Sequence, residues 1–480
     1  MFTRFALAAA AVTLLFAGAA HAAPPPEKIA LTGATVITAA GDDIENATIL
    51  VENGTITAVG GDVEIPFDAF EYDVEGKFIM PGMIDPHSSA GMSVQNEPLP
   101  VAPFVSVRDA IDPVQLYFED CLRRGITTVH VSPGNNTVIG GTSMVVSPIG
   151  RSVSDMTIIE HAAMKFSATP RAGYDRMRQL AEIREAFFTL EQTTKALAEE
   201  KYEESKRDDG EPLDVLPDEA AERGMELLED EDFDLGDQRL RQVARGELQT
   251  WMAALTAGDV RSALAMADDL GVTEHTTVVV DASAHKNAEA LKEAGVGVVF
   301  DGELRERVRD PFTGDLSDTF APKVLHDAGI PFAITPEPDA TLAEGYPNYQ
   351  AALLIRYGVP RADAIKAVTQ NAADIIGVGE EVGSIETGKS GNLVVFSGDP
   401  LDFASHVEMV FIEGILAYDR QKDIRLERLL NLEAASANDE DMSAETAEDA
   451  ADTASDDGSA DAPSASTDGD NAGDTGGDSE

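Results

Sequence analysis

Residues 76–92, which read GKFIMPGMIDPHSSAGM, constrain the fold of this chain more than any other stretch. Two short apolar runs, at residues 78–80 and 83–84, are separated by Pro81-Gly82, a dipeptide that breaks one strand from the next. The second run is apolar on both faces, as expected of a strand buried in a parallel barrel. Polar groups with ligand chemistry follow at residues 85–89, and the carboxyl ends of barrel strands are where such folds place their chemistry. The stretch therefore predicts the first strand of a parallel α/β barrel with a site at its end.

The remainder of the chain supports this interpretation through its alternation of strand and helix patterns. Apolar, β-rich runs alternate with amphipathic helical segments, which indicates a parallel sheet. The predicted strands lie at residues 126–131, 163–166, 248–255, 276–281, 296–300 and 331–335. Counting the irregular segments, there are about eight strand–helix units, the number in a (β/α)8 TIM barrel. We therefore predict a distorted TIM barrel over residues 81–377. Before it, Asn53-Gly54 between two β-rich runs predicts a tight hairpin.

Two motifs carry a resemblance to the amidohydrolase superfamily, in its imidazolonepropionase-like secreted branch. PGMIDPHSS at residues 81–89 resembles the family's first strand, roughly PGhIDxHxH, where h is apolar. Residues 364–377 are similar to its T-x-N-x-A helix, and residues 383–400, GSIETGKSGNLVVFSGDP, resemble its GxhxxGKxADhhhh turn and strand. The resemblance implies a small composite β-sandwich, built from residues 23–80 and 378–432, beside the barrel.

The same resemblance implies a metal site, but this chain lacks most of its ligands. The family typically uses His-x-His on strand 1, a histidine on each of strands 5 and 6, an aspartate on strand 8, and often a lysine or glutamate on strand 4. Here strand 1 keeps His87, while Ser89 replaces the second histidine. The expected strands 5 and 6 contain no histidine, and Thr335-Pro336 stands where the family has its aspartate. Because a catalytic zinc needs about three protein ligands, we predict that this chain holds no binuclear metal centre.

A degenerate site of this kind has a short set of candidate residues, and no catalytic residue can be assigned. His87 is the candidate metal ligand, and Lys165 lies where a strand-4 lysine would project inward. The pocket candidates are Ser89, Lys165, His285, Glu337 and Asp339. No cofactor is expected beyond a single divalent metal such as zinc.

Three functional interpretations follow. By resemblance, the chain is a hydrolase of non-peptide C–N bonds in an amide, cyclic amide or imidazolone-like substrate. The missing ligands favour a catalytically inactive homologue, acting as a binding module for a small molecule or as the partner subunit of an active amidohydrolase. The third interpretation is a reduced site with one metal held by His87 and displaced acidic groups. A homo-oligomer is compatible with each of them.

The net charge limits which partners the protein can have, and the two ends of the chain indicate its compartment and a disordered segment. Residues 1–22 have a basic n-region, an apolar h-region and a small-x-small end, which predicts a signal peptide and export, as to a periplasm. The formal charge is −52, which argues against nucleic acid or an anionic membrane as a partner. Residues 433–480 hold 16 acidic and no basic residues and little apolar surface, so we predict a disordered tail.

Two further features allow both a structural and a functional interpretation. Cys121 is the sole cysteine, so no intrachain disulfide can form, and its apolar helical context favours a core thiol over a nucleophile. Gly140-Gly141 permits a close backbone approach, either in a plain tight turn or against a ligand.

Overall fold

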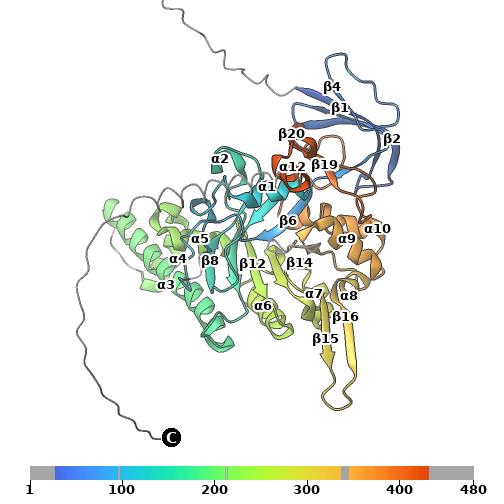
Figure 1. Ribbon diagram of the computed structural model, residues 1–480. Coiled ribbons are helices and arrows are strands. Elements are labelled where there is room, and N and C mark those ends of the chain that lie inside the picture. Colours follow the sequence, from blue (N-terminus) through green and yellow to red (C-terminus); the bar gives the residue numbers. More distant parts are fainter. Residues whose placement is uncertain (1–26, 96–97, 211, 213–214, 337–344, 432–480) are drawn as a thin grey trace, which may run out of the picture. The chain divides into compact units, whose positions relative to one another are not determined.

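The computed structural model describes residues 27–95, 98–210, 212, 215–336 and 345–431 (Figure 1). The chain divides into two compact units, residues 1–421 and residues 422–480. The predicted signal peptide at residues 1–22 and the acidic tail at residues 433–480 lie outside the described residues. In the second unit the structure describes helix α12 (Ile424–Leu430), which begins where the Asp423 side chain accepts the N–H groups of Arg425 and Leu426.

Strands from both ends of the first unit share one eight-stranded sheet. Its order is β20-β19-β18-β5-β1-β2-β3, with β4 paired to β1. The strands are β1 (Lys28–Val36), β2 (Ile44–Glu52), β3 (Thr55–Gly60), β4 (Phe70–Asp73), β5 (Phe78–Pro81), β18 (Leu393–Phe396), β19 (Val407–Ile412) and β20 (Ile415–Asp419). The predicted hairpin at Asn53-Gly54 is confirmed: both residues have positive φ, 49° and 83°, and the turn joins β2 to antiparallel β3.

The middle of the chain forms two further sheets that carry the site. One is four-stranded, β10-β9-β7-β6, and the other six-stranded, β17-β14-β13-β12-β11-β8. Their strands are β6 (Met83–Ser88), β7 (Ile126–Val131), β8 (Ile139–Thr142), β9 (Met144–Val146), β10 (Thr157–Ile159), β11 (Ala163–Ser167), β12 (Gln249–Ala254), β13 (Thr276–Val280), β14 (Gly297–Phe300) and β17 (Ala333–Ile334). From β11 to β17 each neighbour is parallel, so the predicted α/β class is confirmed.

Hydrogen bonding among the described strands departs from a closed barrel in two places. Between β7 and β11 lie β8 and β9, which are consecutive, and both run antiparallel to their neighbours. Between β17 and β6 there is no ladder; instead the Ile84 N–H donates to the Val368 carbonyl at 3.1 Å, and Asn371 Nδ2 to the Phe332 carbonyl at 3.2 Å. Thr335-Pro336 explains the second departure, because a proline cannot donate to a ladder and ends β17 after two residues.

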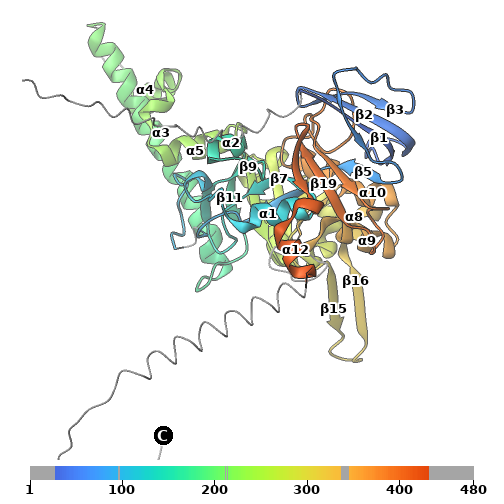
Figure 2. The same ribbon diagram turned by 45° about the horizontal axis from the view of Figure 1, so that its top comes forward.

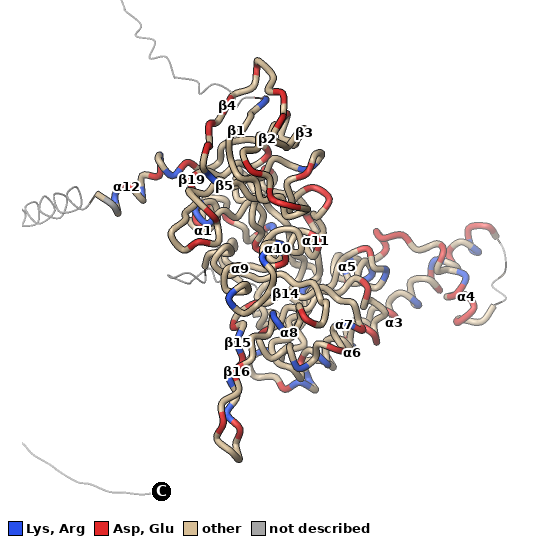
Figure 3. The backbone as a smooth tube through the Cα atoms, turned by 90° about the vertical axis from the view of Figure 1, so that its right-hand side faces the viewer, with Lys and Arg blue, Asp and Glu red and all other residues tan. Residues whose placement is uncertain are grey.

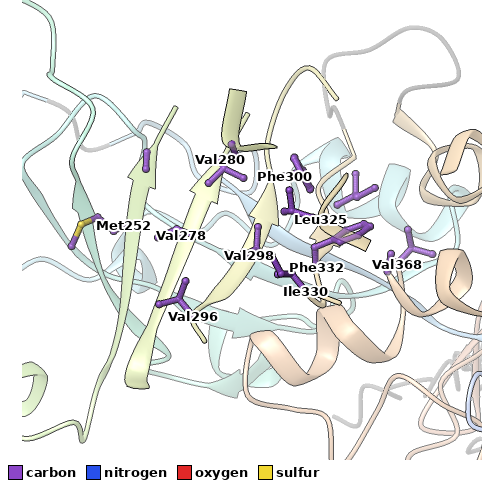
Figure 4. Packing of buried hydrophobic residues seen from close by; sticks show 14 of the residues in the cluster. Met252, Val278, Val280, Val296, Val298, Phe300, Leu325, Ile330, Phe332 and Val368 are labelled. Atoms are coloured by element: carbon purple, nitrogen blue, oxygen red, sulfur yellow. The ribbon is translucent and has the colours of Figure 1, made fainter. Parts of the chain in front are cut away.

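Helices flank these sheets, and some of them cover the outward faces of the strands (Figure 1). They are α1 (Leu116–Arg123), α2 (Val153–Met156), α3 (Arg176–Asp208), α4 (Pro217–Gly224), α5 (Leu235–Ala244), α6 (Ala257–Asp269), α7 (Ala288–Ala294), α8 (Ala321–Asp327), α9 (Pro347–Arg356), α10 (Arg361–Lys366) and α11 (Gln370–Ile375). Figure 4 shows Val278, Val298 and Phe300 on the outward faces of their strands, in one cluster with Leu325 of α8. Alternate residues face inward and form a separate cluster: Ile84, Trp251, Val279, Val299, Ala333 and, from α11, Ala372 and Ala373.

Two exposed features lie outside this framework. Helices α3 and α4 pack side by side in an arm between β11 and β12 (Figure 2), and acidic residues are frequent along it (Figure 3). The hairpin β15 (Arg305–Arg309) and β16 (Leu316–Phe320) was not predicted, because its strands alternate charged and short polar residues with few apolar ones. No helix in the described part of the chain has the length and apolar character that a bilayer span requires.

Gly224 sets the spacing of the α3–α4 arm, and we expect Gly224→Ala to weaken it. A Cβ at this buried position would lie 1.8 Å from the Ala198 carbonyl oxygen, which is backbone and cannot swing away. The helices must therefore separate, at a cost of about 2–3 kcal/mol in the free energy of unfolding. Urea unfolding measures this cost, with Gly41→Ala as the control, since a Cβ at Gly41 meets nothing within 4 Å. A Gly224→Ala midpoint equal to that of the unaltered chain would contradict this packing.

Candidate functional site

His87 lies at the carboxyl end of β6 and is turned inward by an irregularity in that strand. The register of β6 against β7 shifts between Asp85 and Ser88, so the simple alternation that places Ile84 inward and Asp85 outward is reset. The His87 side chain is 5% exposed, and its Nδ1 lies 3.2 Å from a carboxylate oxygen of Asp301. Asp301 directly follows β14, so residues from two strand ends meet here.

Lys165 and Asn135 complete a closed set of hydrogen bonds with these two residues. Lys165 projects inward from β11 and is fully buried. Its Nζ lies 2.7 Å from His87 Nε2 and donates to Asn135 Oδ1, also at 2.7 Å. Asn135 Nδ2 then donates to Asp301 Oδ2 at 3.1 Å. We call these four residues, His87, Lys165, Asn135 and Asp301, the polar ring.

The charges of the polar ring follow from its burial and its contacts. Burial, followed by repulsion from the Lys165 ammonium, lowers the pKa of His87, so the imidazole is neutral at pH 7. Burial alone would raise the pKa of Asp301, but its hydrogen bond with His87 and the nearby charges reverse the direction and lower it. A neutral His87 that accepts from Lys165 at Nε2 must donate from Nδ1, which fits its contact with Asp301. With Lys165 as an ammonium, which lowers the pKa values of both His87 and Asp301, its charge is opposite to that of the Asp301 carboxylate.

Trp251 and His130 pack beside the polar ring, on the side of His87. Trp251 of β12 is fully buried, with its ring nearly parallel to that of His87 at a centroid distance of 6.1 Å. His130 of β7 meets Trp251 edge-on at 4.2 Å, donates from Nδ1 to the Pro86 carbonyl, and contacts Ser143 Oγ through Nε2 at 2.7 Å. Burial lowers the pKa of His130 to about 3, so it is a neutral structural histidine at physiological pH.

On the opposite side of β6, Asp85 forms a separate buried contact. The Tyr117 hydroxyl donates to one of its carboxylate oxygens at 2.7 Å, and the His87 backbone N–H to the other at 3.3 Å. Burial raises the pKa of Asp85 to about 7, although both hydrogen bonds oppose the shift. Cys121 lies nearby in α1, and burial raises the pKa of its thiol, so the predicted core position is confirmed.

The described residues do not fit the metal centre that the resemblance implies. Only His87 and Asp301 in the polar ring are ordinary zinc ligands, and both ring nitrogens of His87 already have partners. The inward positions of β12 and β13 carry Trp251 and Val279 rather than histidine. Over the described ranges, no group of three or more His, Cys, Asp or Glu side chains is placed to hold a metal ion.

Of the residues singled out from the sequence, His87 and Lys165 meet and the others do not join them. The Ser89 hydroxyl accepts from Gln95 Nε2 at 2.5 Å. His285, in the 3-10 helix Ala282–Asn287, contacts Glu306 of β15 at 2.7 Å. Glu337 and Asp339 lie outside the described residues.

Sequence reasoning missed Asn135, Asp301 and His130, and it left Gly140-Gly141 open between a tight turn and a close approach to a ligand. Asp301 had a usable signal, because it follows an apolar strand just as the polar residues after Ile84 do. His130 sits on the same face of β7 as Thr128, which the alternation of that strand also indicates. At Gly141, φ is 99° and a Cβ would lie 2.4 Å from the Val105 carbonyl oxygen, so the close approach there is structural.

Comparison with known proteins places this geometry among amidohydrolases. The model of the amidohydrolase family matches residues 166–418, more than half of the 480 residues. The chain is 25% identical over 418 residues to the amidohydrolase tasK of Hapsidospora irregularis, covering 77% of this chain and 40% of tasK. It therefore spans less than half the length of that relative. It is 24% identical over 386 residues to an imidazolonepropionase of Geobacillus kaustophilus, covering 74% of this chain and 84% of that protein.

A solved structure also indicates the amidohydrolase family. An amidohydrolase from Thermotoga maritima MSB8 superposes with a TM-score of 0.67 at 26% identity, covering 82% of this chain and all of that one. The family match begins directly after Lys165, so His87 and Lys165 lie outside it and Asp301 lies inside it. Because the family model matches more than half of the chain, and the structural relative aligns over its full length, this chain belongs to the amidohydrolase family.

Proposed function

We propose that this amidohydrolase-family chain binds a small amide, cyclic amide or imidazolone-like molecule at the polar ring, without a binuclear metal centre. The observation that carries the proposal is the state of Asp301. Its side chain is 29% exposed, while His87 and Asn135 contact it from the protein side. An ionised carboxylate held in this way accepts a ligand N–H group, and N–H groups are common to amides and imidazolones. The imidazolonepropionase relative supports the same ligand class.

The strand ends give this proposal its framework. We interpret the positions occupied by β6, β7, β8 with β9, β11, β12, β13, β14 and β17 as a distorted (β/α)8 barrel. In that interpretation the eight-stranded sheet from both chain ends corresponds to the family's β-sandwich. Ligand binding at the carboxyl ends of β6, β11 and β14 then follows the general rule for such barrels.

Calorimetric titration with hydantoin, a cyclic amide with two N–H groups, tests the proposal. We expect binding to hydantoin but not to its N,N′-dimethyl form, which lacks the donors. Asp301→Asn should weaken binding by about tenfold or more, because a hydrogen bond to a charged group is lost. The matched control is Asp281→Asn, since Asp281 also follows an apolar strand but bonds to Ser283. Equal affinity for both compounds, or equal losses in both variants, would refute this role for Asp301.

Hydrolysis is the second candidate function, and family membership favours it. In this case the protein would cleave the same class of compound rather than only bind it. Following hydantoin by chromatography, with and without added zinc, separates the two functions. Cleavage that a chelator abolishes would replace the binding proposal with the hydrolase.

A partner role and export remain part of the proposal. Among the described residues no group of three His, Cys, Asp or Glu side chains could hold a metal ion, which supports pairing with a second, active amidohydrolase. We propose a periplasmic or otherwise secreted location from the N-terminal sequence. Size-exclusion chromatography with light scattering, on protein recovered from the exported fraction, tests both points.

A further inference from the structure

The environment of Lys165 Nζ is that of a metal ion rather than of an ordinary lysine. The nitrogen is fully buried and lies 2.7 Å from both an imidazole nitrogen and an amide oxygen. Imidazole nitrogen and amide oxygen are common ligands of divalent cations in proteins. Lys165 thus places a positive charge where two such donors converge.

The second contact of His87 strengthens this comparison. Metal-binding histidines usually donate their other ring N–H to a carboxylate, which fixes the tautomer and the ring orientation. His87 has this arrangement, with Nδ1 against Asp301 and Nε2 against Lys165. Asp301 therefore holds His87 as a carboxylate holds a metal-binding histidine. At Nε2, where the metal would bind, His87 contacts the Lys165 ammonium instead.

We propose that the Lys165 ammonium takes the place of the catalytic metal, so that the polar ring is a cation site closed by the protein's own side chain. The balance of charge agrees, because one ammonium neutralises one carboxylate in a buried setting. A divalent ion at the same point would meet the ammonium at contact distance, and within the described residues no group of three His, Cys, Asp or Glu side chains is placed to hold it. The inference does not depend on which ligand the site binds.

The proposal predicts that one substitution opens the site to zinc. Lys165→Glu removes the ammonium, shortens the side chain and adds a carboxylate beside His87 Nε2 and Asn135 Oδ1. The new carboxylate and His87 Nε2 are ordinary zinc ligands, and the Asn135 amide oxygen adds a weaker third donor, so we expect about one additional zinc per chain in Lys165→Glu. Zinc should also raise the melting temperature of Lys165→Glu and leave that of the unaltered protein unchanged.

The design must separate this site from the many acidic side chains, which bind zinc weakly. Full-length protein is soaked in zinc with bicarbonate, desalted and analysed for metal, and each protein is compared with its own His87→Ala counterpart. Bicarbonate is included because carbon dioxide would convert a free lysine amine into a carbamate ligand. We expect no difference between the unaltered chain and His87→Ala, and a difference of about one zinc between Lys165→Glu and Lys165→Glu/His87→Ala.

Either of the two zinc comparisons can overturn the proposal. A zinc in the unaltered chain that His87→Ala removes would show that Lys165 does not exclude the metal. A folded Lys165→Glu that gains no zinc would show that Nζ does not mark a cation position. The comparison of the unaltered chain with His87→Ala needs no substitution of Lys165, so it tests the proposal even where Lys165→Glu fails to fold. It is also independent of the hydantoin titration, so the two proposals can fail separately.

Discussion

Replacing Lys165 by methionine should lower the free energy of unfolding by about 3 kcal/mol or more, because it removes one partner of a buried charged contact. The methionine has a similar length but cannot donate to His87 Nε2 or Asn135 Oδ1, so both acceptors lose a hydrogen bond inside the protein. Asp301 also loses its only countercharge within the polar ring. Urea unfolding, analysed with the same m-value for both proteins, measures the loss in the free energy of unfolding.

Lys286→Met is the matched control for Lys165→Met. The Lys286 side chain is 44% exposed and pairs with Glu306 at the surface, and such pairs contribute about 1 kcal/mol or less. A Lys165→Met variant as stable as Lys286→Met would mean that the polar ring is not formed in solution. In that case its role in binding would fall as well.

Asp85→Asn should change the pH dependence of stability, and this is the second large effect. Burial raises the pKa of Asp85 to about 7, above the ordinary value of 3.8, despite the hydrogen bonds from Tyr117 and the His87 N–H. Between these two values the folded chain binds the proton more tightly than the unfolded chain. The contribution of Asp85 is therefore favourable at low pH and is lost as pH rises from about 4 to 7, by roughly 4 kcal/mol in all.

The test compares Asp85→Asn with the unaltered protein at pH 5 and pH 8.5. Asparagine keeps the shape without the charge, so the variant should gain stability relative to the unaltered chain by about 2–3 kcal/mol between the two pH values. Taking the difference cancels the titration of every group that both proteins share. A difference that stays constant with pH would contradict the raised pKa of Asp85.

The sequence predicts the strands of the site better than it predicts the long-range hydrogen bonds that join its residues. Residues 126–131 are a strand with the predicted bounds, because six β-rich residues follow a glycine that ends a helix. Periodicity indicates that Lys165 faces inward from β11, whereas the inward position of His87 depends on the register shift in β6 and was expected only from the family resemblance. Asn135 lies in a loop, where no periodicity exists. Its contact with Asp301 spans 166 positions, and local patterns cannot pair residues at that distance.

The departures from a regular barrel have the same origin. The antiparallel direction of β8 and β9 depends on how the loop before them folds back, which residue composition does not encode. Hairpin β15–β16 has few buried residues, so it lacks the alternation of apolar and polar residues that marks a half-buried strand. Its position after a strand makes His285 a site candidate, but the side chain contacts Glu306 of that hairpin instead.

Whether Lys165 occupies the cation position at the strand ends of this amidohydrolase-family chain can be seen in an anomalous scattering map. The chain has 87 acidic residues, so a total metal count includes zinc bound loosely at its surface. Diffraction at the zinc absorption edge, from crystals soaked in zinc and bicarbonate, locates each ion instead. We expect no peak at His87 Nε2, and density for Lys165 Nζ in contact with that nitrogen. A zinc peak beside His87, with Lys165 displaced or carboxylated, would contradict it.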